Sequence, residues 1–298
     1  MGGRGDWLVA VAALLAIGFT AGAAADPRLL EAARGQDWAA LHALLEGGGG
    51  LDVNAAQPDG STALSWAVHW DAVESAQRLL EVGADPDIGN DYGVTPLFLA
   101  VRNRNAAMVK TLLEVEGGAD PNAVLWSGET PLMTAAKAGD RRLAVLLLEH
   151  GADVNAREPR RGQSALMWAI SFGHPEVARV LIEHGADVNA RTRMLAEDFT
   201  PMELEGYLVN VSVTPRGGYT PLMFAARAGD GETARLLLDH GAELNTFHEE
   251  HGPPLVIAAA AGHEALYRVL LVLWRARARL LREKRLQRVE AERQLRQV

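Results

Sequence analysis

The sequence of 298 residues contains no cysteine, which excludes disulfide bonds, a thiolate nucleophile and a lipoprotein anchor on a cysteine. It also lacks a Gly-x-Ser-x-Gly nucleophile turn, a phosphate-binding glycine loop and the His-Glu-x-x-His zinc motif. These motifs supply nucleophiles, phosphate sites or metals to large classes of enzymes. Their absence predicts a protein that is not an enzyme and has neither a cofactor nor a small-molecule substrate.

Histidines are present, but their spacing is poor for a metal site. His248 and His251, three residues apart beside Glu249 and Glu250, form one weak candidate, and we predict no metal there. We assign the others to helix starts, turns and the surface: His42, His69, His150, His174, His184, His240 and His263.

Charged residues are absent from a stretch near the N-terminus, where residues 7–25 are uncharged and follow one basic residue, Arg4. The stretch ends in small side chains, with an Ala-x-Ala arrangement at Ala23 and Ala25. This pattern predicts residues 1–25 as a secretory signal peptide cleaved after Ala25, which makes the mature protein periplasmic or secreted. The alternative is an uncleaved inner-membrane anchor, because about 19 apolar residues are just long enough to span a bilayer. Only in that case is the membrane a partner.

A recurring pattern dominates the rest of the chain. Similar stretches start at Gly60, Gly93, Gly128, Gly162, Gly218 and His251. Successive starts lie 33, 35, 34, 56 and 33 residues apart. A period of this length indicates supersecondary units that bury their apolar faces only by stacking on one another.

The units share an internal order. Thr-Pro-Leu begins two residues after a glycine at Thr95, Thr130 and Thr220, and a Gly-Ala-Asp or Gly-Ala-Glu motif closes a leucine-rich second helix. In this order the unit resembles the ankyrin repeat, over residues 26–274. The resemblance implies an all-α solenoid of stacked helix-turn-helix units with β-hairpin-like finger loops. It further implies a bacterial-type, secreted protein of seven units including caps, which start near residues 26, 60, 93, 128, 162, 218 and 251.

The chain departs from the family's pattern at the slot after Thr-Pro-Leu, where the family usually has a histidine. This sequence places there Ser65, Phe98, Met133, Met167 and Met223. We interpret the row as apolar packing in place of a polar ladder, a role that methionine tolerates well. The adjacent slot is also predicted to lie in the core, with Trp66, Leu99, Thr134, Trp168 and Phe224.

The long step between Gly162 and Gly218 indicates a loop insertion at residues 190–217. Tyr207 to Val213 alternates in polarity as a strand does, and Thr200-Pro201 or Thr214-Pro215 are predicted turns. Long loops in compact repeats are usually functional or disordered. The insertion is therefore either a flap that contacts a partner or a merely tolerated addition.

The C-terminal segment has a different composition. Because the last repeat lacks a closing glycine, its second helix is predicted to continue through residues 275–298 as a basic helical extension. Residues 274–298 carry nine basic and three acidic side chains, a net charge of +6, so the rest of the chain carries −9 − 6 = −15. The extension could contact anionic lipid or nucleic acid, or pack on the acidic body. Alternatively it has no function and comes from a shifted reading frame.

Ankyrin-like solenoids bind through their finger tips and the exposed side of each first helix. Carried onto this chain, these positions predict a partner-binding surface of Trp70, Tyr92, Arg102, Trp126, Lys137, Arg160, Arg161, Phe172, Tyr219 and Arg227. Aromatic and arginine side chains dominate the energetics of interfaces. Trp126 and Tyr219 are expected to be exposed, so that their truncation weakens binding without affecting stability.

We therefore predict a non-catalytic protein-protein interaction scaffold that is exported across the membrane. It binds a protein partner through its concave face and finger loops, and nucleic acid is disfavoured as a partner. Two alternatives stay open: an accessory or protective subunit of a periplasmic enzyme, and a membrane-anchored adaptor with a basic tail.

Overall fold

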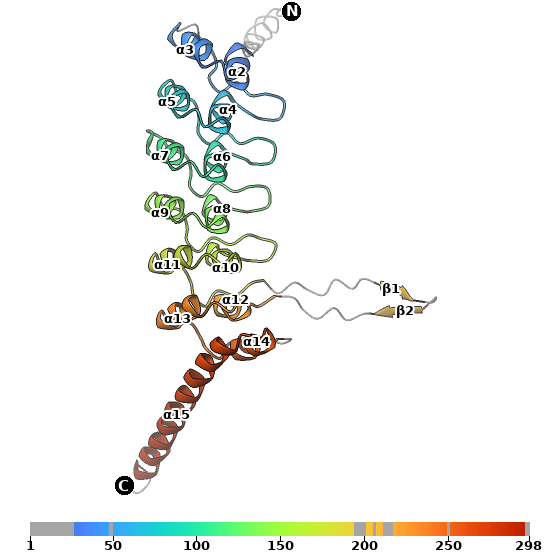
Figure 1. Ribbon diagram of the computed structural model, residues 1–298, viewed down its shortest axis with the longest axis vertical. Coiled ribbons are helices and arrows are strands. Elements are labelled where there is room, and N and C mark those ends of the chain that lie inside the picture. Colours follow the sequence, from blue (N-terminus) through green and yellow to red (C-terminus); the bar gives the residue numbers. More distant parts are fainter. Residues whose placement is uncertain are drawn as a thin grey trace, which may run out of the picture.

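The computed structural model describes residues 27–47, 50–193, 201–204, 207–210, 217–248 and 251–295. The predicted signal peptide at residues 1–25 lies outside these ranges and stays a prediction. In the described ranges the helices form pairs that stack in two columns along one long axis (Figure 1). The first helices are α2 (Pro27–Arg34), α4 (Ala63–His69), α6 (Pro96–Arg102), α8 (Pro131–Ala138), α10 (Ala165–Ser171), α12 (Pro221–Ala228) and α14 (Pro254–Ala260). The second helices are α3 (Trp38–Glu46), α5 (Val73–Glu81), α7 (Ala106–Glu114), α9 (Arg141–Glu149), α11 (Pro175–Glu183), α13 (Gly231–Asp239) and α15 (Glu264–Leu295). The predicted all-α repeat solenoid is confirmed.

The first helices α4, α6, α8, α10 and α12 begin at side-chain caps. A hydroxyl oxygen accepts a hydrogen bond from the backbone N–H three residues later at Thr62, Thr95, Thr130, Ser164 and Thr220. Proline takes the first helical position of α6, α8 and α12, where the backbone N–H has no partner within the helix. The Thr-Pro-Leu motif is thus a helix start signal.

The turn between the two helices of a unit uses a left-handed backbone conformation. Gly139 and Gly229 end α8 and α12 at φ values of 69° and 72°. In other units the same conformation falls on residues with side chains, namely Gln36, Asp71 and Arg104. The geometry of the turn is therefore fixed by the repeat, and glycine is the residue that adopts it with least strain.

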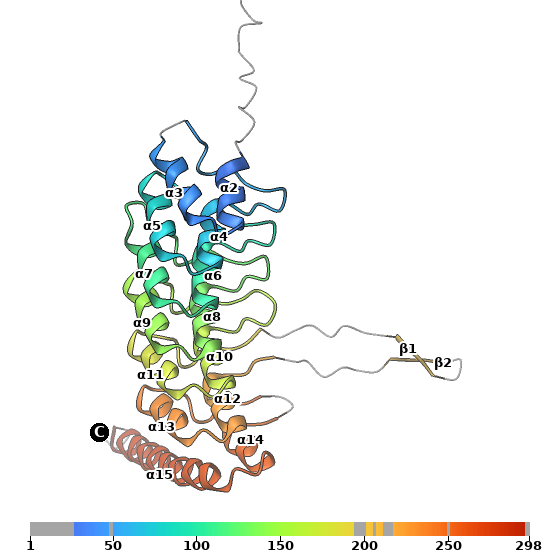
Figure 2. The same ribbon diagram turned by 45° about the horizontal axis from the view of Figure 1, so that its top comes forward.

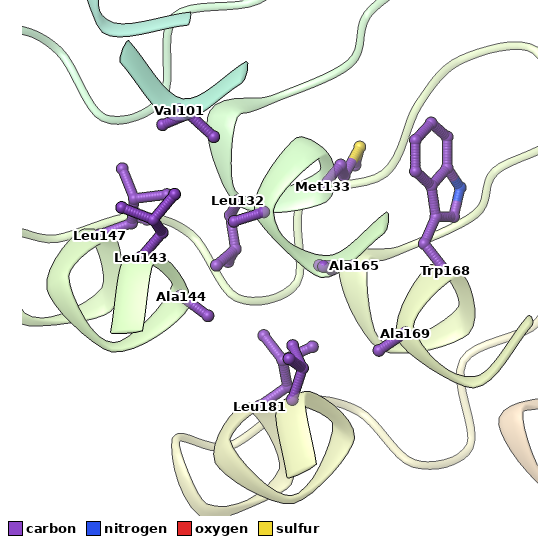
Figure 3. Close-up of a cluster of buried hydrophobic side chains, with 14 of the residues drawn as sticks. Val101, Leu132, Met133, Leu143, Ala144, Leu147, Ala165, Trp168, Ala169 and Leu181 are labelled. Carbon is purple, nitrogen blue, oxygen red and sulfur yellow. The ribbon is translucent and has the colours of Figure 1, made fainter. Parts of the chain in front are cut away.

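The core runs continuously between the two columns. In Figure 3, Leu132 of α8, Leu143 and Leu147 of α9 and Leu181 of α11 meet between neighbouring units, with Ala144 where the helices come close. Stacking therefore buries the apolar side chains that a single unit would expose to solvent.

The two slots after the helix start differ in burial. The slot that replaces the family's histidine is buried in every case, at Ser65, Phe98, Met133, Met167 and Met223. The prediction that the adjacent slot also lies in the core is correct only for Trp168. Its equivalents Trp66, Leu99, Thr134 and Phe224 are half-buried, because this slot faces the open side of the first-helix column.

Asparagines near the end of the closing motif join neighbouring units. The Asn122 side chain accepts a hydrogen bond from the Asp153 N–H at 2.7 Å and donates one to the Gly151 carbonyl at 3.0 Å. Asn189 forms the same two bonds, at 2.8 and 3.1 Å, with the unit that follows the insertion. The insertion therefore leaves the stacking of its flanking units intact.

The described part of the insertion contains two paired strands beside the stack. Strands β1 (Pro201–Leu204) and β2 (Tyr207–Asn210) pair antiparallel and lie on the side of the finger loops (Figure 1). At its base, the Thr192 N–H donates to the Tyr219 carbonyl and the Gly218 N–H donates to the Thr192 carbonyl. The prediction of a turn at Thr200-Pro201 is wrong for Pro201, which opens β1, a strand position where proline is tolerated. The alternative turn at Thr214-Pro215 lies outside the described residues.

Helix α15 leaves the stack. It packs against α14 near its start (Figure 2) but diverges from α13 (Figure 1), whereas each earlier second helix packs against the one before it. The side chains from Val272 to Arg288 are exposed, so this stretch does not pack on the acidic body. Among the described residues, no helix combines the length and the apolar character that crossing a membrane requires.

Candidate binding surface

Three hollows lie in a row along the first-helix column, between the helices and the finger loops. The first has a volume of about 200 Å³ beside Trp66, the second about 400 Å³ beside Phe98, and the third about 510 Å³ beside Trp168. Arg102 lines both the first and the second hollow, and Lys137 lines both the second and the third. The hollows therefore form one continuous surface, which we call the inner row.

The third hollow combines cations with aromatic rings. The Lys137 ammonium lies 5.3 Å from the ring centroid of Trp168 and 5.7 Å from that of Phe172. Arg161 of the finger loop and Arg227 of α12 complete its cationic lining. Within the described part of the chain, no carboxylate lines this hollow or forms an ion pair with these three cations. The hollow is suited to bind an anionic group that also carries apolar surface.

Trp168 carries a buried hydrogen-bond donor beside the third hollow. Its side chain is 8% exposed, and its indole N–H has no acceptor among the described residues. In Figure 3 the ring nitrogen lies on the side of the ring turned away from Met133. A buried donor without an acceptor costs about 1–3 kcal/mol. Because the nitrogen is buried, Trp168 contributes ring surface to the hollow and not an accessible donor.

A buried carboxylate, which sequence reasoning missed, holds Arg161 in place. Glu158 is almost fully buried and accepts hydrogen bonds from the backbone N–H groups of Arg160, Arg161 and Gln163. The Arg193 N–H donates to the Arg161 carbonyl from the next finger. The signal in the sequence was a single acidic residue just before Pro-Arg-Arg in a turn.

The finger tips form a second exposed patch. Tyr92 and Trp126 are 63% and 83% exposed, and the Trp126 N–H donates to the Tyr92 carbonyl at 3.2 Å. The backbone bond places the two aromatic side chains on adjacent fingers. We call these two residues the finger pair.

The structure places the remaining predicted residues elsewhere. Trp70 stacks on Trp66 at 6.5 Å between ring centroids and lies outside the lining of the three hollows. Arg160 is exposed on the finger that carries Arg161, but it does not line the third hollow. The expectation that Tyr219 is exposed is wrong. Its ring is half-buried against Phe224 and the nearby histidines, because the base of the insertion draws it onto the next unit.

The histidines contact the backbone. His174 and His263 lie over Gly139 and Gly229 and bond through Nε2 to the carbonyls of the preceding unit. The histidines expected to be simply solvated instead bond through Nδ1 to a carbonyl of the preceding helical turn, at His150, His184 and His240. Among the described residues, no group of three or more histidine, aspartate or glutamate side chains could hold a metal ion.

Comparisons with known proteins agree with this architecture. The family model described as "Ankyrin repeats (3 copies)" matches residues 29–124, 117–192 and 202–278. NF-kappa-B inhibitor alpha of Sus scrofa is 37% identical over 102 residues, which are 33% of this chain and 32% of that protein. Human B-cell lymphoma 3 protein is 41% identical over 116 residues, which are 38% of this chain and 25% of that protein. The chain thus spans less than a third of these relatives.

Solved structures match over a larger part of the chain. The ankyrin repeat domain of Bcl-3, described as a member of the IkappaB protein family, superimposes with a TM-score of 0.67 at 25% identity. That match covers 82% of this chain and 98% of the other. The human ASB11 ankyrin repeat domain superimposes with a TM-score of 0.59 at 26% identity and covers 82% of this chain and 96% of its own.

Proposed function

The chain belongs to the ankyrin repeat family, and on this premise we propose that it is a non-catalytic scaffold that binds a protein partner. The binding surface is the inner row together with the finger pair. Ankyrin repeat relatives are protein-interaction scaffolds, and the name of NF-kappa-B inhibitor alpha describes an action on another protein. Family membership does not identify the partner of this chain, because one repeat fold serves many recognition tasks.

One observation carries the proposal. Exposed aromatic rings and unpaired cations follow one another across adjacent units, on the side of the stack that the fingers border. Large exposed patches of this composition are typical of partner-binding surfaces. The outer, second-helix column instead carries ion pairs between its own units, such as Arg78 with Glu46 and Arg179 with Glu232.

We propose that the scaffold acts outside the cytoplasm, since residues 1–25 have the pattern of a secretory signal peptide. The mature protein then begins at Asp26. Mass spectrometry of the protein purified from the extracytoplasmic fraction tests the cleavage, and an intact N-terminus on the purified chain contradicts it and supports the membrane-anchored alternative.

Affinity capture from that fraction tests the binding function. The wild-type protein and a Tyr92→Ala, Trp126→Ala variant serve as baits, and we expect the variant to lose the specific partner. Trp274→Ala is the matched control, because Trp274 is also exposed but lies on α15, far from the fingers. A Lys137→Gln, Arg161→Gln, Arg227→Gln variant disrupts the inner row. Equal capture by the wild type, the finger-pair variant and this variant would show that these surfaces are not the binding surface.

A further inference from the structure

The third hollow is a positive site on a negative protein. The chain has a net charge of −9, yet this hollow is lined by Lys137, Arg161 and Arg227 and, among the described residues, by no carboxylate. The neighbouring second hollow contains Glu129. Within the inner row, the field therefore favours an anionic ligand most strongly at the third hollow.

Aromatic surface lies between these cations. Trp168, Phe172 and Phe224 line the hollow, and Lys137 is held over the first two of these rings. Phe172 remains 52% exposed. A small inorganic anion would satisfy the cations and leave the exposed ring of Phe172 in water. A ligand that uses the whole hollow has both carboxylates and an apolar side chain.

The dimensions of the hollow suit an extended chain. It reaches from Lys137 on α8 past α10 to Arg227 on α12. Packed helices lie 8–10 Å apart, so two steps span roughly 16–20 Å. An extended peptide rises about 3.3 Å per residue and covers this span with about five or six residues.

We propose that the third hollow binds an extended acidic segment of a partner protein. Carboxylates of the segment contact Lys137, Arg161 and Arg227, and one apolar side chain packs between Phe172 and Phe224. The inference rests on the proposed function and adds a ligand class to one part of the inner row. A long polyanion such as nucleic acid is disfavoured at this site, because beyond the hollow it meets the stack, which belongs to the part of the chain that carries −15.

Fluorescence anisotropy with defined peptides tests the proposal on the full chain. The probe is fluorescein-labelled Asp-Glu-Leu-Glu-Asp-Glu, and its neutral counterpart is Asn-Gln-Leu-Gln-Asn-Gln. We expect the neutral peptide to bind about tenfold more weakly or worse. Replacing the leucine of the probe by serine should also weaken binding. Binding of the acidic probe should fall steeply as salt approaches about 1 M, where the screening length is about 3 Å.

Protein variants locate the site. A Lys137→Gln, Arg161→Gln, Arg227→Gln variant keeps the backbone carbonyls that His174 and His263 contact, so we expect it to fold. Its affinity for the acidic probe should fall about tenfold or more. Arg141→Gln, an exposed cation at the start of α9, should bind with unchanged affinity. Circular dichroism and urea unfolding of each variant establish that the fold is preserved.

Three results would overturn the inference. They are equal binding of the acidic probe to the triple variant, equal binding of the neutral peptide, and tighter binding of an oligothymidylate of the same length that depends on Lys137, Arg161 and Arg227. Each leaves the scaffold function standing if a captured partner still depends on the finger pair or the inner row. If partner capture depends on neither the finger pair nor the inner row, the proposed scaffold function is itself contradicted, whatever the peptide results.

Discussion

At the scale of single residues, Trp126 and Tyr219 lie in contrasting surroundings although both are within two residues of the glycine that starts a repeat. Trp126 stands in solvent at 83% exposure, whereas the Tyr219 ring packs on Phe224 at 5.6 Å and on His248 at 4.5 Å between centroids. We expect Trp126→Ala to change the free energy of unfolding by less than about 0.5 kcal/mol. Tyr219→Ala should cost about 1–3 kcal/mol, because it exposes apolar surface and removes ring contacts. Urea unfolding followed by circular dichroism measures both, and equal effects would contradict the assignment.

Leu147 shows the opposite extreme of burial. It is completely buried, and in Figure 3 it lies between α8 and its own helix beside Leu132 and Leu143. We expect Leu147→Ala to destabilise the protein by about 2–5 kcal/mol, since the cavity is enclosed on several sides and cannot easily collapse. Leu280→Ala, on the exposed part of α15, is the control and should leave the urea midpoint unchanged. A small effect of Leu147→Ala would mean that neighbouring units separate more readily than the structure indicates.

Which residues are buried could be predicted from the repeat, but where half-exposed rings point could not. The repeat phase correctly placed Met133 and Met167 in the core, because equivalent positions share one environment. The same phase put Trp66 and Phe224 in the core with Trp168, although their burial depends on what the neighbouring unit offers at that slot. Tyr219 was misjudged because the base of an insertion, a feature outside the repeat, determines its surroundings.

At the scale of elements, the left-handed turn between paired helices is a conserved geometry filled by different residues. Gly139 has a φ of 69°, and a Cβ added there would lie 2.5 Å from the His174 ring. Gln36 adopts a φ of 61° at the equivalent turn of the first unit. The two positions therefore allow opposite predictions from one geometry.

We expect Gln36→Gly to stabilise the protein by about 0.5–1 kcal/mol, because glycine relieves the left-handed strain at a modest entropic cost. Gly139→Ala should destabilise it by about 1–2 kcal/mol or more, since strain and the clash with His174 add. Gln36→Ala is the control for lost side-chain contacts, because it keeps the Cβ and should change little. Thermal and urea unfolding give the comparison, and a destabilised Gln36→Gly would mean that the glutamine side chain matters more than its backbone angle.

Helix starts were the most predictable elements, since Thr-Pro-Leu carries its own physical reason in a hydroxyl cap and a proline that needs no donor. The hydrogen bonds that Glu158 accepts from the finger backbone were not predictable in the same way. Its role requires three backbone N–H groups to converge on one carboxylate, which depends on the fold of the finger and not on spacing alone. The sequence likewise allowed only part of the third hollow to be predicted. Arg161 and Lys137 were predicted as binding residues. That they line one hollow together with Trp168 depends on the stacking of units.

At the scale of the whole molecule, charge and stability are divided between two parts. Residues 274–298 carry +6 and the preceding chain −15, and α15 carries the basic side chains away from the stack (Figure 1). The sequence predicted the charge separation and the continuing helix. It could not predict the direction of α15, because that depends on how α15 packs against α14 and diverges from α13.

The stack should therefore be stable without the extension. We expect a chain that ends at Trp274 to unfold within about 0.5 kcal/mol of the full chain, because the described side chains from Arg275 to Arg288 are exposed and bury no core surface. Leu270→Ala, at a fully buried position earlier in the same helix, should instead cost about 2–5 kcal/mol. Urea unfolding of the shortened chain, the Leu270→Ala variant and the full chain separates these cases. A large loss on shortening, together with a stability that falls as salt is added to the full chain, would show that the basic helix rests on the acidic body in solution.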